Sequence, residues 1–170
     1  MRVVSAVRAD LPAWLDLARE VEPLFGPLVA NPDFCAPLER AIEAGNAFCV
    51  RTDDGPPGAP LLGGLLWFPD PPRYKLGWLA VAEQARRRGV ARLLVDDALA
   101  RVARPATIRL TTFAEGAPEG EAARRLYERV GFRPAGSAPD NPAGFRCEVL
   151  SMTITQQSTA RAVIAADGRY

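Results

Sequence analysis

Histidine is absent from this chain of 170 residues, and its basic side chains are almost all arginine, since Lys75 is the single lysine. Without histidine, neither a Ser-His nor a Cys-His catalytic pair can form. Cysteine is scarce as well: Cys35, Cys49 and Cys147 lie far apart and lack CxxC spacing. No metal site is therefore expected. Acid–base chemistry must use Asp, Glu, Tyr, Cys, Arg, the one lysine, a chain terminus or water.

Long apolar runs are also missing. No segment reaches the roughly 18 apolar residues that a membrane-spanning helix needs, and charge interrupts the N-terminal MRVVSAVRADLPAW too early for a signal peptide. The net charge is only +1, from 21 basic and 20 acidic residues, which gives no general attraction to nucleic acid or to an anionic membrane. We therefore expect a cytoplasmic protein that binds neither, with its three cysteines as buried free thiols.

The length and the hydrophobic fraction of 48% are those of one folded domain with a full core. We assign this domain to residues 1–155 and a weakly structured C-terminal tail to residues 156–170. The tail mixes a polar TQQST stretch with an apolar ARAVIAA stretch. It is either a frayed end or a segment that packs on a neighbouring subunit or over a substrate cleft. A homodimer is therefore left open.

Hydrophobic periodicity predicts an alternation of strands and helices. A short strand over 3–7 precedes a helix that begins after the N-cap candidate Asp10 and ends near Pro23. The later elements are a helix over 33–44, strands over 47–51, 61–68 and 74–81, a helix over 89–101, a strand over 107–113, a helix over 119–130, and strands from 132 and over 145–155. The order is βααβββαβαββ. The apolar run GWLAV at 77–81 suggests a strand buried on both faces.

A basic turn joins that apolar strand to the helix that follows it. The turn reads Arg86-Arg87-Arg88-Gly89-Val90-Ala91. Free amides in the first turn of a helix bind anions, helped by the helix dipole. Glycine lets a phosphate approach the backbone, so a pyrophosphate would fit here. The pattern is weak by itself. It is also compatible with a solvated basic loop, or with a nucleic-acid patch, for which no second basic cluster with interleaved aromatics is present.

A second motif occupies the last predicted helix, where the sequence from Ala123 reads ARRLYERVGF and ends the helix at Gly131. The pattern AxxLYExxGF, following RxxGxA, resembles the GNAT (Gcn5-related N-acetyltransferase) family. The order of the elements also resembles that family's fold from about residue 3 to residue 155. The resemblance implies an α/β fold with a mixed, mostly antiparallel sheet of about seven strands. It further implies that the sheet splits near its fourth and fifth strands and has helices on both faces.

The resemblance assigns a site for acetyl-CoA, the acyl donor, with no metal. Arg86, Gly89 and Ala91 match the family's pyrophosphate motif, and the neighbouring amides would hold the CoA diphosphate. The strand ending at Val81 would pair with the pantetheine arm, and one of its amides would polarise the thioester carbonyl. The implied cofactor-binding residues are Leu79, Ala80, Val81, Arg86, Arg87, Arg88, Gly89, Val90, Ala91 and Arg92.

Tyr127 matches the tyrosine that often lies near the CoA sulfur in this family and protonates the leaving thiolate. The alternative is a core tyrosine whose hydroxyl bonds to the backbone. The sequence departs from the family pattern at two other functional positions. Gly120 stands where the family often has an asparagine that contacts the pantetheine, and no carboxylate lies near the end of the strand at Val81. Other candidate bases, each also readable as a surface carboxylate, are Glu20, Glu22, Asp33, Asp70 and Glu115. None is preferred.

These observations predict an acetyl-CoA-dependent N-acetyltransferase that acts by direct transfer to an amine of a small molecule or peptide. Its acceptor is not specified by the sequence. The alternative is a CoA-binding regulatory or interaction module without catalysis, which the missing asparagine and the missing base would suit. A nucleic-acid binder is a third hypothesis, and the low net charge argues against it.

Overall fold

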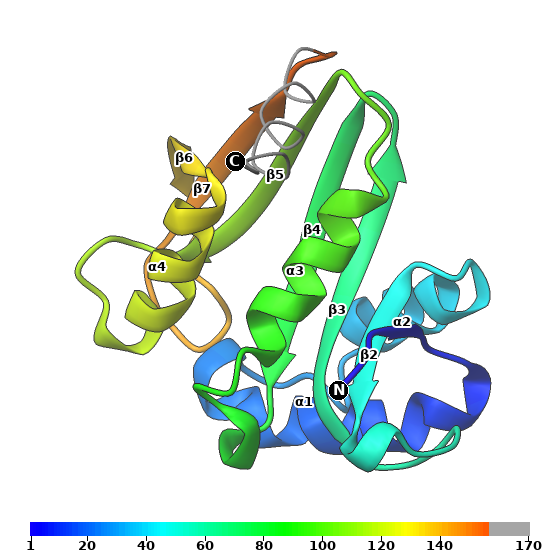
Figure 1. The fold of residues 1–170 in the computed structure, drawn as a ribbon. Coiled ribbons are helices and arrows are strands. Elements are labelled where there is room, and N and C mark those ends of the chain that lie inside the picture. The colour runs from blue at the N-terminus through cyan, green and yellow to red at the C-terminus, as the bar shows by residue number, and fades with distance from the viewer. Residues whose placement is uncertain (157–170) are drawn as a thin grey trace, which may run out of the picture.

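A seven-stranded sheet forms the centre of the protein, with helices on both of its faces (Figure 1). This computed structural model describes residues 1–156. All but the first residue of the predicted tail, 157–170, lie outside the described residues, so the division at residue 155 stays a prediction. The order βααβββαβαββ is confirmed. The predicted fold class is confirmed as well.

The elements agree with the sequence pattern to within a few residues. The strands are β1 (Val4–Ser5), β2 (Ala47–Arg51), β3 (Leu61–Asp70), β4 (Arg73–Val81), β5 (Ala106–Phe113), β6 (Arg133–Ala138) and β7 (Cys147–Ile154). The helices are α1 (Leu11–Phe25), α2 (Pro32–Glu43), α3 (Val90–Ala100) and α4 (Glu121–Val130). Helix α1 continues past Pro23, which lies in its last turn. Within residues 1–156, none of the helices has both the length and the apolar character that crossing a membrane requires.

The order of strands in the sheet is β1-β2-β3-β4-β5-β7-β6. Every neighbouring pair is antiparallel except β4 and β5, which run parallel. Their pairing covers only Arg73–Leu76 of β4 and Thr107–Leu110 of β5. The remaining residues, 77–81 and 111–113, do not pair with each other. The predicted split between the fourth and fifth strands is therefore present.

A β-bulge marks the point at which the strands part. On β3, Leu66 pairs with Trp78 and the next residue, Trp67, pairs with Leu76, so that Gly77 is the extra residue on β4. A bulge bends its strand and increases its twist. A side chain at this glycine would meet the ring of Phe68 at 2.2 Å. A larger residue at position 77 would therefore require the Phe68 ring to move, and the bulge coincides with the end of the β4–β5 pairing.

Two consecutive glycines in β3 show which helix covers which face. A Cβ atom at Gly64 would lie 2.6 Å from the indole of Trp14 in α1, and one at Gly63 would lie 2.7 Å from Val90 in α3. Successive residues of a strand point to opposite faces. Helices α1 and α3 therefore lie on opposite faces, each close to the β3 backbone. We call the first of these the α1 face.

The prediction that the run 77–81 is buried on both faces is wrong at Gly77, which is exposed, and holds only in part at Leu79 and Val81, which are half-buried. Exposure alternates along the strand: Lys75 and Gly77 are exposed, while Tyr74, Leu76 and Trp78 are buried. The Tyr74 hydroxyl accepts a hydrogen bond from the N–H of Ala103, just after α3, at 3.1 Å. Lys75 therefore points to the α1 face, and its exposure shows that no helix within residues 1–156 covers it.

The three cysteines are free, as predicted, but only Cys49 is fully buried. Cys35 and Cys147 are half-buried, which corrects the expectation of three buried thiols. Burial raises the pKa of the Cys49 thiol to about 12. It therefore stays protonated and serves as a small core residue.

Asp10 precedes α1 as predicted, but its carboxylate does not cap that helix. It is fully buried and accepts two hydrogen bonds from the Arg51 guanidinium, at 2.9 and 2.7 Å. It also accepts the backbone N–H groups of Gly58 and Val7, at 2.8 and 2.9 Å. Burial by itself would raise the pKa of Asp10, but these hydrogen bonds outweigh it and lower the pKa. The carboxylate links the start of α1 to β2 and to the loop before β3.

Asp10→Asn should strongly destabilise the protein, because it leaves the buried Arg51 charge without a counter-charge. Breaking one partner of a buried pair costs about 3–5 kcal/mol. Urea unfolding at neutral pH measures the loss. The matched control is Asp16→Asn, whose ion pair with Arg19 is exposed and should contribute about 1 kcal/mol or less.

The sign of the pH dependence follows from the lowered pKa. The contribution of Asp10 is complete above its unfolded pKa of about 3.9 and is lost as the pH falls through the folded value. The difference in free energy of unfolding between wild type and Asp10→Asn should therefore become smaller at acidic pH. If Asp10→Asn lowers the free energy of unfolding no more than Asp16→Asn does, the buried ion pair does not stabilise the fold as proposed.

Candidate functional site

The split between β4 and β5 leaves one edge of β4 free. Leu79, Ala80 and Val81 pair with Leu65, Gly64 and Gly63 of β3 on one side only. Their other edge faces the side from which β5 has turned away. Backbone N–H and C=O groups at such a place need partners. An extended ligand with amide groups can add to this edge as a strand would. These are the three strand residues predicted to contact the cofactor.

The basic turn continues directly from this edge. A short 3₁₀ turn (Glu83–Ala85) leads into Arg86, Arg87 and Arg88. All three arginines are exposed. None makes an ion pair or a side-chain hydrogen bond within residues 1–156. Their charges are available to a bound anion.

Gly89 is the N-cap residue of α3 and has a φ of 82°, a conformation that favours glycine. No side chain caps the helix at this position, and the first amides of a helix have no partner within it. A Cβ atom at Gly89 would have no neighbour within 4 Å. The amides at the start of α3 are therefore open to a phosphate.

Two of the predicted cofactor-binding residues offer only their backbone. Val90 is buried beneath β3. The Arg92 guanidinium pairs with Asp96 at 2.7 Å, one turn further along α3. The turn is also held from the opposite side of the sheet, because the Glu20 carboxylate of α1 accepts a hydrogen bond from the N–H of Glu83. That bond ties α1 to the start of the basic turn.

Tyr127 lies on the inner side of α4 and is only 5% exposed. Its ring contacts Phe132 edge-on, with the ring centres 5.8 Å apart. Within residues 1–156 its hydroxyl makes no hydrogen bond, so the alternative of a hydroxyl bonded to the backbone is not observed. Burial raises the pKa of Tyr127 well above its usual value. At neutral pH the phenol therefore keeps its proton.

Gly120 has a steric reason to depart from the family's asparagine. It precedes α4 and lies against Phe113, the last residue of β5. A Cβ atom at Gly120 would lie 2.3 Å from the Phe113 side chain. An asparagine does not fit unless Phe113 moves. Gly120 instead allows α4 to pack closely against β5.

The carboxylates named as candidate bases are either engaged or exposed. Glu22 accepts the N–H groups of Leu28 and Val29, at 2.8 and 3.0 Å, and these hydrogen bonds lower its pKa. Asp70 pairs with Arg73 at 3.1 Å, and Glu20 is bound to the basic turn as above. The other two, Asp33 and Glu115, are exposed. The general base stays unassigned.

Sequence reasoning missed a cluster of aromatic rings over the wide end of the split. Phe25, the last residue of α1, contacts Phe113 and Trp78, with ring centres 5.8 and 6.4 Å apart. Phe145, in the loop between β6 and β7, contacts Phe113 at 5.5 Å. We call Phe25, Trp78, Phe113 and Phe145 the aromatic bridge. Because its members are far apart in sequence, no local pattern could have joined them.

A polar contact holds the two ends of the aromatic bridge together. The Asn141 amide donates a hydrogen bond to the Leu24 carbonyl at 2.8 Å. The loop between β6 and β7 is thereby tied to the end of α1. Beneath it, the buried indole N–H of Trp78 has no hydrogen-bond partner in the described part of the chain. A buried donor of this kind is costly unless a ligand or water satisfies it.

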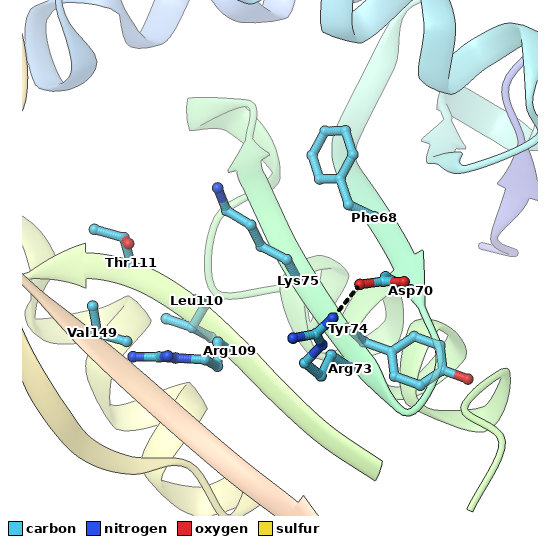
Figure 2. Close-up of a pocket in the computed structure, with 9 residues that line it drawn as sticks. All are labelled: Phe68, Asp70, Arg73, Tyr74, Lys75, Arg109, Leu110, Thr111 and Val149. Atoms are coloured by element: carbon cyan, nitrogen blue, oxygen red, sulfur yellow. Dashed lines mark hydrogen bonds and ion pairs between the residues drawn. The ribbon is translucent and has the colours of Figure 1, made fainter.

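A cavity of about 370 Å³ opens at the narrow end of the split, where the pairing of β4 with β5 ends (Figure 2). Sequence reasoning missed this cavity too, although Asp70 had been named as a candidate base. Its walls come from β3, β4, β5 and β7. The lining residues are Phe68, Asp70, Arg73, Tyr74, Lys75, Arg109, Leu110, Thr111 and Val149.

Comparison with known proteins agrees with this geometry. The family described as "Acetyltransferase (GNAT) domain" matches residues 44–134, more than half of the chain. This span runs from the end of α2 to the start of β6 and includes the free edge of β4, the basic turn and Tyr127. No match was found among curated proteins.

Solved structures share the fold. The chain is similar to a histone acetyltransferase HPA2 and related acetyltransferase from Corynebacterium glutamicum, with 24% identity, 88% of this chain and 94% of that chain covered, and a TM-score of 0.62. It resembles a chain of a NatC complex bound to Gag peptide and CoA, with 21% identity, 91% and 100% coverage, and a TM-score of 0.69. A ribosomal-protein-alanine N-acetyltransferase from Brucella melitensis is 19% identical, with 91% and 100% coverage and a TM-score of 0.66.

Three findings indicate the same family. They are the split between β4 and β5, the uncapped start of α3 after the basic turn, and the family match over residues 44–134. The chain belongs to the GNAT acetyltransferase family.

Proposed function

We propose that this protein is an acetyl-CoA-dependent N-acetyltransferase that transfers the acetyl group directly to an amine of a small molecule or peptide in the cytoplasm. The observation that carries the proposal is the free edge of Leu79–Val81, which leads straight into the uncapped start of α3. A diphosphate and an extended amide-containing arm are the two parts of CoA that such a surface suits.

The basic turn would hold the CoA diphosphate. The amides of residues 86–92 would donate hydrogen bonds to phosphate oxygens, and the exposed Arg86, Arg87 and Arg88 would add charge. The pantetheine arm would pair with the free backbone groups of Leu79, Ala80 and Val81. The thioester would then lie in the split, between β4 and α4.

In the transfer step, a neutral amine attacks the thioester carbonyl, and a β4 amide near Val81 stabilises the oxyanion. The C–S bond then breaks, and Tyr127 donates its proton to the departing thiolate. An ordinary amine has a pKa near 10 and must first lose a proton. A carboxylate or a chain of water molecules would take this proton, and no single carboxylate is assigned to the step.

A CoA-binding module without catalysis is the second candidate, and the engaged carboxylates and Gly120 favour it. Thermal shift with CoA, combined with a thiol-release assay over a panel of amines, separates the two functions. Stabilisation by CoA together with thiol release and acetylated product, detected by mass, supports the transferase. Stabilisation without product on any amine supports the binding module.

A negative charge at Gly89 should weaken CoA binding. The matched pair is Gly89→Asp and Gly89→Asn, because both side chains share the same strain at a φ of 82° and differ in charge. We expect Gly89→Asp to bind CoA at least tenfold more weakly than Gly89→Asn, about 1.4 kcal/mol. Calorimetry measures the affinity, and circular dichroism checks the fold. Equal CoA affinity of the two folded variants would show that the diphosphate does not bind at this turn.

Tyr127→Phe should lower kcat while CoA affinity is retained. The substitution keeps the ring and its contact with Phe132 but removes the proton. General acid catalysis is typically worth about 10²–10⁴-fold, and a CoA thiolate leaves fairly well unprotonated, so a fall of about tenfold or more is expected. The measurements are kcat for any accepted amine, CoA affinity and Tm. An unchanged kcat with a lower Tm would make Tyr127 a packing residue.

A further inference from the structure

Two cations lie side by side on the open part of the α1 face. Lys75 of β4 and Arg109 of β5 are register partners in the parallel pair, and both are exposed. Neither makes an ion pair or a side-chain hydrogen bond within residues 1–156. Like charges on neighbouring strands repel each other and destabilise the pair. The sheet therefore carries an unfavourable charge arrangement that an anion would relieve.

The nearby carboxylate does not provide this relief. Asp70 is paired with Arg73 at 3.1 Å at the rim of the same cavity. This leaves Lys75 and Arg109 as the two uncompensated charges of the lining. Figure 2 shows Lys75 extending from β4 toward the gap between β4 and β5, on the side where Thr111 lies. Phe68 forms an apolar wall beside them.

The cavity also lies at the end of the split that the aromatic bridge does not cover. The aromatic bridge covers the wide end of the split, and the Asn141–Leu24 hydrogen bond holds it in place. The narrow end is lined by Leu110, the last paired residue of β5, and by Thr111, the first unpaired one. The cavity therefore adjoins the point at which β4 and β5 part.

We propose that Lys75 and Arg109 bind an anionic group of the acceptor, so that the acceptor is an amine with a carboxylate several bonds away from it. This inference rests on the proposed function. A strand rises about 3.3 Å per residue, so Lys75 and Val81, near which the oxyanion would form, are at most about 20 Å apart along β4, and less because of the bulge at Gly77. The lysine side chain reaches part of that distance. The carboxylate thus lies about 10 Å from the amine.

This separation defines the class of acceptor. In an α-amino acid the amine and its carboxylate share one carbon and are too close together. An ω-amino acid of middle length suits the distance. So does a peptide whose second or third residue is acidic, since an extended chain advances about 3.3–3.6 Å per residue. The Phe68 wall would contact the methylene groups between the two charges.

A panel of acceptors measures the preference of the full-length wild type. One set runs from glycine through aminobutyrate and aminohexanoate to aminooctanoate, each compared with the alkylamine of equal length. The other set compares the tripeptides Ala-Glu-Ala, Ala-Gln-Ala and Ala-Lys-Ala. We expect kcat/KM to rise about tenfold or more for the acidic member at the matching length, and to fall for the lysine peptide. The set with the larger rise distinguishes a small-molecule source from a peptide source.

Single substitutions test whether Lys75 and Arg109 produce the preference for acidic acceptors. Lys75→Gln and Arg109→Gln should each raise KM for the acidic acceptor several-fold, with kcat, CoA affinity and the KM of neutral amines little changed. Lys75→Arg should retain the preference, and Lys75→Glu should transfer it to the lysine peptide. The control is Arg129→Gln, an exposed position on α4 on the opposite face. Because the two cations repel, Tm should not fall in the glutamine variants, whereas a structural role would lower it.

Calorimetry with Ala-Glu-Ala in the presence of CoA gives a readout that needs no catalysis. The anion subsite is wrong if wild type acetylates acidic and neutral amines with equal kcat/KM. It is also wrong if both glutamine variants keep the preference for acidic acceptors. In either case the proposed transferase activity is unaffected. If no amine is acetylated, the proposed transferase is wrong, and the calorimetric titration decides the subsite by itself. Equal heats of Ala-Glu-Ala binding to wild type, Lys75→Gln and Arg109→Gln would then contradict the anion subsite.

Discussion

The end of pairing between β4 and β5 is the constraint on which the site depends. Hydrogen bonding stops after Leu76 and Leu110, where the bulge at Gly77 bends β4 beneath the Phe68 ring. Backbone groups in the middle of a sheet then lack partners, which is costly unless a ligand or water supplies them. The free edge of β4 therefore originates in the parting of these two strands.

Positive charge is concentrated at two places around this opening, although the whole chain carries only +1. Arg86, Arg87 and Arg88 precede α3, while Lys75 and Arg109 lie on the opposite face. The proposed donor and acceptor would each approach from the face that carries its own cations and meet in the split. Direct transfer requires such an arrangement, because both reactants must be bound at once.

The carboxylates near the site act as structural anchors. Glu20 of α1 is bound to the basic turn, and Glu22 holds the loop after α1 through the N–H groups of Leu28 and Val29. Asp10 is buried with Arg51 and connects α1 to β2. The hydrogen bonds to Asp10 and Glu22 lower the pKa of each of these two carboxyls, so both are weak bases.

Local sequence patterns determined the order of elements, the basic turn before α3 and the place of Tyr127 on α4, because periodicity, a glycine N-cap and a helix stop act over a few residues. Tertiary structure alone decided which side chains meet. The partner of Asp10, the exposure of Lys75 and the steric need for glycine at position 120 each depend on residues many positions away. The cavity and the aromatic bridge likewise join segments from α1 to β7. Such contacts arise from the register of strands and the packing of helices, which a single chain's periodicity does not encode.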